Sequence, residues 1–261
     1  MQKKARRADG SAGDVDYGEI GRTYGRYRQP DPVIAAQIHQ ALGNAQTILN
    51  VGAGAGSYEP TDRQVTAVEP SASMRAQRPT SLSEAIDGVA ESLPFNNASF
   101  DASMATVTIH QWSDLEKGLS EMRRVTRGPI VLLVCDPSLM KDYWLNDYIP
   151  EVRDTEARRF PPLDRIIRAL GGKVDIHSVP VPLNCSDGFN EAYYGRPEAF
   201  LDSDARLACS SWNLVSQESV QRFVAELSRD LDNGEWDRRY GHFRKLPFFD
   251  GPLRLIIGEP T

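Results

Sequence analysis

The sequence predicts an α/β protein built on a doubly wound, mostly parallel β-sheet. An apolar run at 47–51 ends in three alternating glycines, which is typical of a buried strand that enters a tight turn. A second apolar run, at 64–68, ends in the carboxylate of Glu69. Helical patterns alternate with such runs as far as residue 135, which favours right-handed crossovers and parallel strands.

The first predicted element is a helix that Asp31 caps and that Pro32 begins, with Gly43 available to close it. Ser113 and Glu116 form a capping box for a later helix. The run at 130–135 is almost wholly apolar, so this strand should be covered on both faces. The other strands are expected at 64–68, near 84–89, at 102–105, at 174–181 and at 253–257.

The last two predicted strands are separated by about seventy residues, far more than a normal connection needs. This segment, 182–249, should therefore form a largely helical lid inserted before the last strand. The region from Leu139 to Phe249 carries 15 of the 22 aromatic residues. Aromatic rings bury large areas, so most should hold the lid on the sheet, and several should face a site at the carboxyl ends of the strands.

Composition excludes several classes of protein. A net charge of −6 argues against a nucleic-acid partner. Three widely spaced cysteines, Cys135, Cys185 and Cys209, suggest neither a disulfide framework nor a zinc site, and the four histidines have no metal-ligand spacing. No run is long enough to span a membrane, and the basic start lacks the apolar core of a signal peptide. We expect a cytoplasmic monomer or homodimer without a metal.

The glycines and Glu69 together predict a nucleoside site, the alternative being a glycine-rich turn without a ligand. Gly52, Gly54 and Gly56 would let the backbone approach a ligand closely, and Glu69 could bind both hydroxyls of a ribose. The dinucleotide fingerprint G-x-G-x-x-G is not met, because Ser57 stands at its third glycine.

Four motifs follow one another between residues 47 and 136: G-x-G-x-G followed by Glu69, A-E-x-L-P-F-x-x-x-S-F-D at 90–101, the loop at 105–114 and L-x-E-x-x-R-V at 119–125. In this order they resemble the motifs of the type 11 branch of class I S-adenosylmethionine (SAM) dependent methyltransferases. Val89 departs from the family, which often has an acidic residue there for the adenine amine. His110-Gln111 stands for the usual His-His, and Gly128-Pro129 for P-G-G.

The resemblance implies a seven-stranded Rossmann-like fold with an antiparallel last strand, SAM as cofactor and a defined division of the chain. The expected parts are a cofactor-binding core with a covering helix at 1–136, helices at 137–173, a strand at 174–181, the lid at 182–249 and the last strand at 250–261. The implied cofactor-binding residues are Tyr17, Tyr24 and Arg28 over the carboxylate, Gly52, Ala53 and Gly54 at the amino-acid end and ribose, Glu69 on the ribose, Pro70, Met74, Ala90 and Glu91 near the adenine, and Ala105 and Thr106 along the methionine part.

The expected reaction moves the sulfonium methyl to an oxygen, nitrogen or carbon atom of a small metabolite by in-line displacement, and the aromatic lid suggests a metabolite of secondary metabolism. His110 is either a general base or a packing and hydrogen-bonding residue. The alternatives are a SAM-binding protein without catalysis and a nicotinamide-dependent oxidoreductase on the same fold. The candidate substrate contacts are Trp112, Tyr143, Asp187, Tyr193 and Tyr194.

Overall fold

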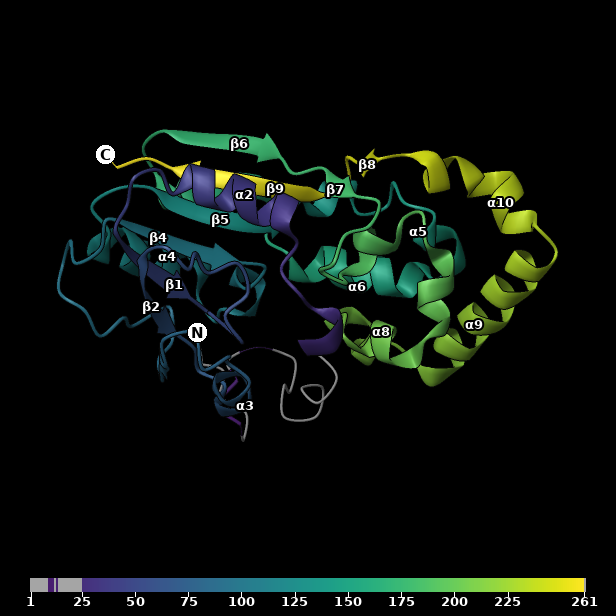
Figure 1. Cartoon of the computed structure of the whole chain (residues 1–261), viewed down its shortest axis with the longest axis horizontal. Helices are drawn as coiled ribbons and strands as arrows, with labels where there is room; N and C mark the ends of the chain where they lie inside the picture. Colours follow the sequence, from purple (N-terminus) through teal and green to yellow (C-terminus); the bar gives the residue numbers. More distant parts are fainter. Residues whose placement is uncertain (1–8, 12, 14–24, 261) are drawn as a thin grey trace.

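Seven strands form one sheet at one end of the elongated molecule (Figure 1). The computed structural model describes residues 9–11, 13 and 25–260. The strand order is β3-β2-β1-β4-β5-β9-β6, and β9 runs antiparallel to both of its neighbours while the other pairs are parallel. The strands are β1 (Thr47–Val51), β2 (Gln64–Val68), β3 (Ala85–Ile86), β4 (Ala102–Thr106), β5 (Ile130–Cys135), β6 (Val174–Ser178) and β9 (Leu253–Gly258).

The predicted fold class is confirmed, and the strands at 47–51, 64–68 and 130–135 have the predicted bounds. Two predicted strands are shorter than expected. The strand expected at 84–89 is only Ala85–Ile86, because the chain turns where the amide of Ser92 donates to the carbonyl of Val89. The strand expected at 174–181 stops at Ser178, since Pro180 has no amide hydrogen with which to continue the ladder.

Helices cover both faces of the sheet. On one face α2 (Pro32–Ala41) shares a buried apolar cluster with Leu133 of β5. On the other face α4 (Leu115–Val125) and α7 (Leu163–Leu170) share a second cluster with Leu132, the adjacent residue of the same strand. Successive residues of β5 therefore point to opposite cores, which explains its unbroken apolar sequence.

The helix caps follow from the residues that precede each helix. The Asp31 carboxylate accepts the amide hydrogens of Val33 and Ile34 at 2.9 and 3.3 Å, as predicted for α2. At α4 the predicted cap was wrong by one residue. Asp114 caps the helix by accepting from Lys117 at 3.0 Å, because Ser113 is engaged by the carboxylate of Glu91.

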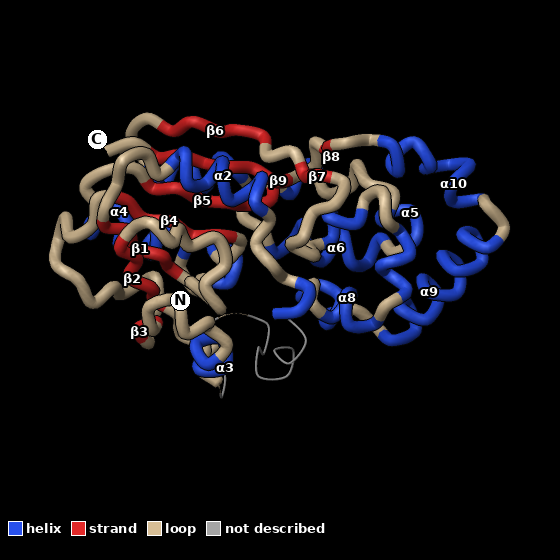
Figure 2. Tube along the Cα trace, viewed as in Figure 1, coloured by secondary structure: helices blue, strands red, loops and turns tan. Residues whose placement is uncertain are grey.

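The lid, 182–249, and the helices at 145–159 together form the other end of the molecule, which is mostly helical (Figure 2). These two stretches of the chain pack on a core of aromatic rings, in which Trp144 contacts Tyr148, Phe200 and Trp236 edge to face. That core is continuous with the apolar cluster on the α2 face of the sheet, so the lid is packed firmly on the sheet. The helices are α5 (Leu145–Tyr148), α6 (Pro150–Arg159), α8 (Ser203–Leu207), α9 (Gln217–Asp232) and α10 (Glu235–Tyr240), and β7 (Val181–Pro182) and β8 (Phe248–Phe249) form a small antiparallel pair beside them.

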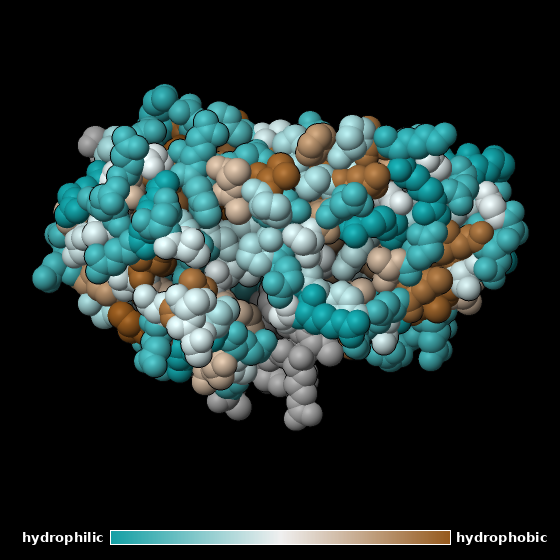
Figure 3. Space-filling view, viewed as in Figure 1, coloured by the Kyte–Doolittle hydropathy of each residue, from teal (hydrophilic) through white to brown (hydrophobic). Residues whose placement is uncertain are grey.

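The surface in Figure 3 is mainly hydrophilic, and its apolar side chains lie in small separate groups. Among the described residues, no helix has both the length and the apolar character needed to cross a bilayer.

Candidate active site

A cavity of about 920 Å³, counted with its open mouth, lies at the carboxyl ends of β1, β2 and β4. We call it the outer cavity. Most of the residues predicted to bind a cofactor meet there, although their positions in the sequence span more than fifty residues. Its lining includes Gly52, Ala53, Gly54, Glu69, Pro70, Met74, Ala90, Glu91 and Thr106, together with Arg28, Trp112 and Asp187.

Among the predicted cofactor residues that the structure describes, Ala105 is not part of this lining. Ala105 is fully buried in the core between the sheet and α4, because it points to the opposite face from Thr106. Tyr17 and Tyr24 lie outside the described residues. The described N-terminal residues Ser11 and Gly13 do line the outer cavity.

The glycine turn after β1 has the left-handed backbone that its residue types predict. Gly52 has φ of 69° and Gly54 has φ of 52°. A Cβ on Gly52 would lie 2.3 Å from Oγ1 of Thr108, so no larger residue fits there without a shift. At these two glycines the turn therefore presents main-chain atoms to the wall of the outer cavity.

Glu69 is held in place by two amide hydrogens. Gly54 donates to its Oε2 and Ser71 to its Oε1, both at 2.8 Å. Burial raises the pKa of Glu69, and the two amides oppose that rise. Each carboxylate oxygen can accept a second hydrogen bond, so Glu69 keeps capacity for the hydroxyl groups of a ligand.

A buried ion pair that the sequence did not predict supports the glycine turn. Arg78 donates to both carboxylate oxygens of Glu59, at 3.0 and 2.9 Å, and the two side chains are 3% and 1% exposed. Asn50 of β1 donates to the same carboxylate at 3.0 Å. Arg78 also approaches the carbonyl oxygen of Gly54 at 3.5 Å. This pair joins the turn to the chain beyond α3 (Ala72–Ala76).

Glu121 of α4 holds the motif at 90–101 in place by hydrogen bonds. Glu121 accepts the amide of Leu93 at 3.0 Å and pairs with Arg124, which also donates to the carbonyl oxygens of Leu93 and Phe95. Its hydrogen bonds with Arg124 hold the pKa of Glu121 at about 2. The Glu91 carboxylate accepts from Ser113 and Asp114 at the start of α4, so its charge is engaged within the protein.

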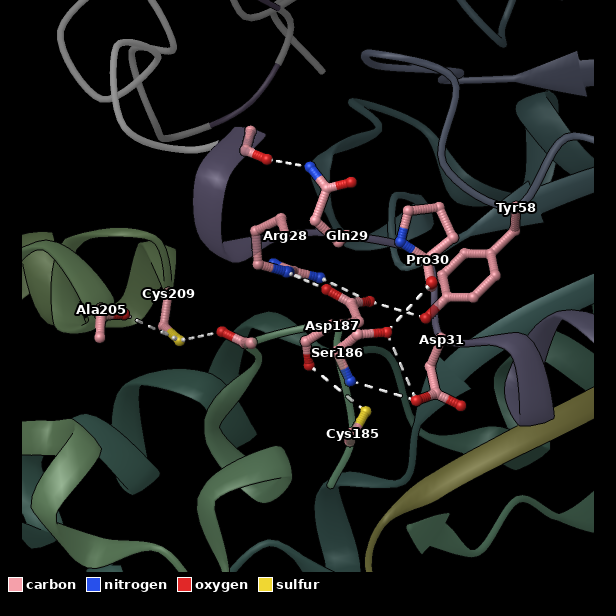
Figure 4. A network of polar contacts seen from close by, with 12 residues as sticks. Arg28, Gln29, Pro30, Asp31, Tyr58, Cys185, Ser186, Asp187, Ala205 and Cys209 are labelled. Carbon is pink, nitrogen blue, oxygen red and sulfur yellow. Dashed lines mark hydrogen bonds and ion pairs between the residues drawn. The ribbon is translucent and has the colours of Figure 1, made fainter. Parts of the chain in front are cut away.

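Three side chains connect separate parts of the molecule by hydrogen bonds (Figure 4). They are Arg28 from the chain before α2, Asp187 from the lid and Tyr58 from the end of the glycine turn. Arg28 Nε lies 2.5 Å from Asp187 Oδ1, and the Tyr58 hydroxyl donates to Asp187 Oδ2 at 2.8 Å. Burial, and then the Asp187 charge, raise the pKa of Tyr58. Arg28, which the resemblance assigned to a cofactor carboxylate, thus pairs here with a carboxylate of the lid.

A second cavity, the inner chamber, has a volume of about 590 Å³, counted with the solvent space at its opening, and lies between the sheet edge and the lid. Arg28 and Val107 line both cavities, so the two spaces adjoin. Val107 has φ of 49°, which is a strained conformation for a β-branched residue. The other described residues of its lining are His110, Cys135, Glu156, Arg159, Phe160, Phe189, Asn190, Glu191, Ala208, Cys209, Ser210 and Leu253.

His110 belongs to the inner chamber, and its ring centroid is 4.3 Å from that of Phe160. Of the predicted substrate contacts, Trp112 and Asp187 line the outer cavity. The three predicted tyrosines line neither cavity, because their hydroxyls and rings contact residues of the lid. The Tyr143 hydroxyl donates to the carbonyl of Asn190, the Tyr194 hydroxyl donates to the carbonyl of Leu246, and Tyr193 packs edge to face on Phe200.

The most strongly charged part of the inner chamber is a triad that no sequence motif indicated. Arg153 is fully buried and bridges Glu156, at 2.5 Å, and Glu191, at 2.6 Å. Asn190 donates to the other oxygen of Glu156 at 2.7 Å. Burial raises the pKa of Glu156 to about 7, with Arg153 opposing the rise and Glu191 adding to it.

Comparison with known proteins gives consistent matches. The model of a methyltransferase domain family matches residues 49–131. A malonyl-[acyl-carrier protein] O-methyltransferase of Erwinia pyrifoliae is 29% identical over 119 residues. That match takes in 42% of this chain and 45% of the relative, so this chain spans less than half of the curated relative's length.

The solved structures extend the likeness to about nine-tenths of the chain. A putative methyltransferase from an antibiotic biosynthesis pathway of Anabaena variabilis is 35% identical, with a TM-score of 0.84, covering 90% of this chain and 99% of that one. A putative methyltransferase of Bacillus halodurans, 18% identical with a TM-score of 0.52, covers 87% of this chain and 99% of that one and shares the fold.

Proposed function

Because this chain belongs to the class I SAM-dependent methyltransferases, we propose that its outer cavity holds SAM and its inner chamber holds a small metabolite that receives the methyl group. The observation that carries this proposal is the junction of the two cavities at Arg28 and Val107. A donor in one cavity and an acceptor in the other would meet there without crossing bulk water.

The residues of the outer cavity fit the chemical parts of SAM. Glu69 has free acceptor capacity for the two ribose hydroxyls, and Pro70, Met74 and Ala90 offer an apolar wall for the adenine. Gly52 and Gly54 leave room for the backbone to approach the ligand. Arg28 suits the carboxylate of the methionine part if it shares its guanidinium with Asp187.

SAM supplies a methyl group on a sulfonium, whose displacement leaves a neutral thioether and needs no acid. The work of the protein is then to align the acceptor and to exclude water. The contacts of Asp187 with Arg28 and Tyr58 hold the lid over the glycine turn, and this helps to exclude water from the site. His110 lines the inner chamber, where it can act as a general base or as a packing residue against Phe160.

The substrate we propose is a small molecule of secondary metabolism, in keeping with the pathway given for the Anabaena relative. The matches described above are to methyltransferases, which favours methyl transfer over the nicotinamide-dependent alternative. The predictions of a cytoplasmic location, of a monomer or homodimer and of no nucleic-acid partner stay predictions.

The test is calorimetric titration with S-adenosylhomocysteine (SAH), the demethylated product of SAM. Glu69→Gln should weaken SAH binding by about tenfold to a hundredfold, since a hydrogen bond to a charged group contributes about 1.5–3 kcal/mol. Glu84→Gln, an exposed carboxylate outside both cavities, is the matched control and should bind SAH like the wild type. Equal affinity of Glu69→Gln and the control would remove Glu69 from the site.

Turnover separates an enzyme from a binding protein. Incubation with methyl-labelled SAM and a bacterial metabolite extract should give a labelled product and SAH. If SAH binds tightly and no extract or amine, alcohol or thiol probe yields a labelled product, the chain is a binding protein without catalysis.

A further inference from the structure

The first described residues of the chain lie against the outer cavity. Gly10 packs so closely on the end of β2 that a Cβ there would overlap the carbonyl oxygen of Pro70, and its φ is 91°. Gly13 lies against the side chain of Gln111, in the short helical turn that follows β4. Pro70 and Gln111 both line the outer cavity, so this N-terminal segment, residues 9–11 and 13, reaches two of its walls.

The carboxylate of Asp9 holds this segment in place. Its Oδ2 accepts the hydroxyl hydrogens of Ser71 and Ser73 at 2.8 and 3.1 Å. Ser11 donates to the same carboxylate through its amide, at 2.9 Å, and through its hydroxyl, at 2.7 Å. The main-chain carbonyl of Asp9 accepts the amide hydrogen of Ala72 at 2.7 Å. Burial raises the pKa of Asp9, but the hydrogen bonds from the serines outweigh burial and lower it, so Asp9 is an ionised acceptor at neutral pH.

Ser71 connects Asp9 to the carboxylate that we assign to the ribose. The amide of Ser71 donates to Glu69 Oε1 at 2.8 Å while its hydroxyl donates to Asp9. The same hydroxyl accepts from the amide of Met74, which belongs to the wall proposed for the adenine. If Ser71 turned away, Gly54 alone of the two amide donors would still hold Glu69. The position of Asp9 therefore affects both the ribose contact and the adenine wall.

We propose that Asp9 is a positioning residue for the cofactor; this rests on the function proposed above. It acts on the ribose through Ser71 and Glu69, and it holds the N-terminal segment against the cavity wall. Asp9 is not among the described lining residues, so it acts through its neighbours. Glu69 lies at the end of the outer cavity assigned to adenosine and Arg28 at the end assigned to the amino-acid part. The effect of Asp9 should therefore be confined to the adenosine part of a ligand.

The test compares two ligands that share adenosine and differ at the amino-acid end. They are SAH and 5′-methylthioadenosine, in which a methyl group replaces the amino-acid chain on sulfur. Both are titrated calorimetrically into the wild type and Asp9→Ala. The variant should bind both ligands more weakly by the same factor, about tenfold, which is the loss of about one hydrogen bond. A general loosening of the fold would weaken SAH more than 5′-methylthioadenosine, because SAH has more contacts to lose.

Substitutions at two positions of the segment, with one control, locate the effect. Asp9→Asn keeps one oxygen for the serine hydroxyls and should lose less affinity than Asp9→Ala. Gly10→Ala keeps the carboxylate but cannot seat the segment on Pro70, so it should also weaken both ligands equally. Asp62→Ala removes an exposed carboxylate of the loop before β2 that lines neither cavity, and it should bind both ligands like the wild type.

Trp112 gives a second readout that does not depend on affinity. It lines the outer cavity next to Gln111, whereas the other three tryptophans are buried in the helical end of the molecule, namely Trp144, Trp212 and Trp236. Acrylamide should quench the fluorescence of SAH-saturated Asp9→Ala more than that of the SAH-saturated wild type, because the segment no longer covers this wall. In a Trp112→Phe background the two proteins should be quenched alike.

The outcomes separate this inference from the proposed function. If the wild type binds neither ligand, the proposed function fails and takes this inference with it. If the wild type binds SAH but not 5′-methylthioadenosine at millimolar concentration, or if Asp9→Ala binds both ligands like the wild type or weakens SAH more than 5′-methylthioadenosine, the positioning role of Asp9 is overturned. Should Asp9→Ala fail to fold, Gly10→Ala decides by the same comparison, and unchanged affinities in that variant overturn the inference.

Discussion

The buried pair of Arg78 and Glu59 offers a sharp test of how the glycine turn is supported. In Arg78→Met the carboxylate of Glu59, 1% exposed, would keep only the amide of Asn50 as a donor within the described chain. The removal of one member of a buried pair costs about 3–5 kcal/mol, because the other charge is left unpaired in a poorly solvated place. For a chain of this size each kcal/mol lowers the melting temperature by about 2–4 °C, so Arg78→Met should melt about 6–20 °C below the wild type.

The double variant Arg78→Met, Glu59→Gln separates charge from packing. It removes the stranded carboxylate together with its partner, so it should recover most of the stability lost in Arg78→Met, and the two single effects should not add. The assays are calorimetric melting and urea unfolding at pH 7. Arg78→Met should also weaken SAH binding, since Arg78 lies behind the turn at Gly54.

Two results would contradict this reasoning about Arg78 and Glu59. An Arg78→Met protein that melts within about 2 °C of the wild type would mean that the pair is solvated in solution, against the burial described here. Additive single effects would mean that the two side chains act independently.

Three further predictions concern single positions. Gly52→Ala should lower the free energy of unfolding by about 1–3 kcal/mol and weaken SAH binding, because the added Cβ would clash with Thr108. Gly43→Ala is the control: Gly43 also has a positive φ but lies in open space, so this variant should lose less stability in the same melting assay. Glu121→Gln should lower stability at pH 7. The pKa of Glu121 lies at about 2 in the folded chain against an ordinary 4.5, so its contribution is present above about pH 4.5 and is lost as the pH falls toward 2; urea unfolding at pH 7 and pH 3 should show the variant and wild type converging in acid. His110→Ala should slow methyl transfer while SAH affinity stays unchanged, because the imidazole of His110 is the candidate general base of the inner chamber, and a full-rate variant would leave His110 as a packing residue.

The outer cavity was predictable because its residues stand at the ends of strands that local patterns reveal. The apolar runs at 47–51 and 64–68 predict two strands, and parallel neighbours end at the same edge of a sheet. Gly52, Gly54 and Glu69 therefore meet at that edge without any knowledge of the rest of the fold.

The roles of the aromatic residues in and beside the lid could not be predicted in the same way. Tyr143, Tyr193 and Tyr194 were expected to contact substrate, yet a ring in a core and a ring in a site have the same local sequence pattern. Their hydroxyls and rings serve the lid because carbonyls and rings distant in sequence happen to lie beside them.

The sequence by itself determined the order of the strands along the chain, the glycine turn and the carboxylate beside it, because each depends on backbone preferences and side-chain periodicity over a few residues. Only the tertiary structure decided that Arg28 pairs with Asp187, 159 residues away, and that Arg153 joins Glu156 to Glu191, 38 residues beyond Arg153. The physical reason is that any arginine can pair with any carboxylate, and the choice of partner is made by the packing of the lid on the sheet, which no local pattern records.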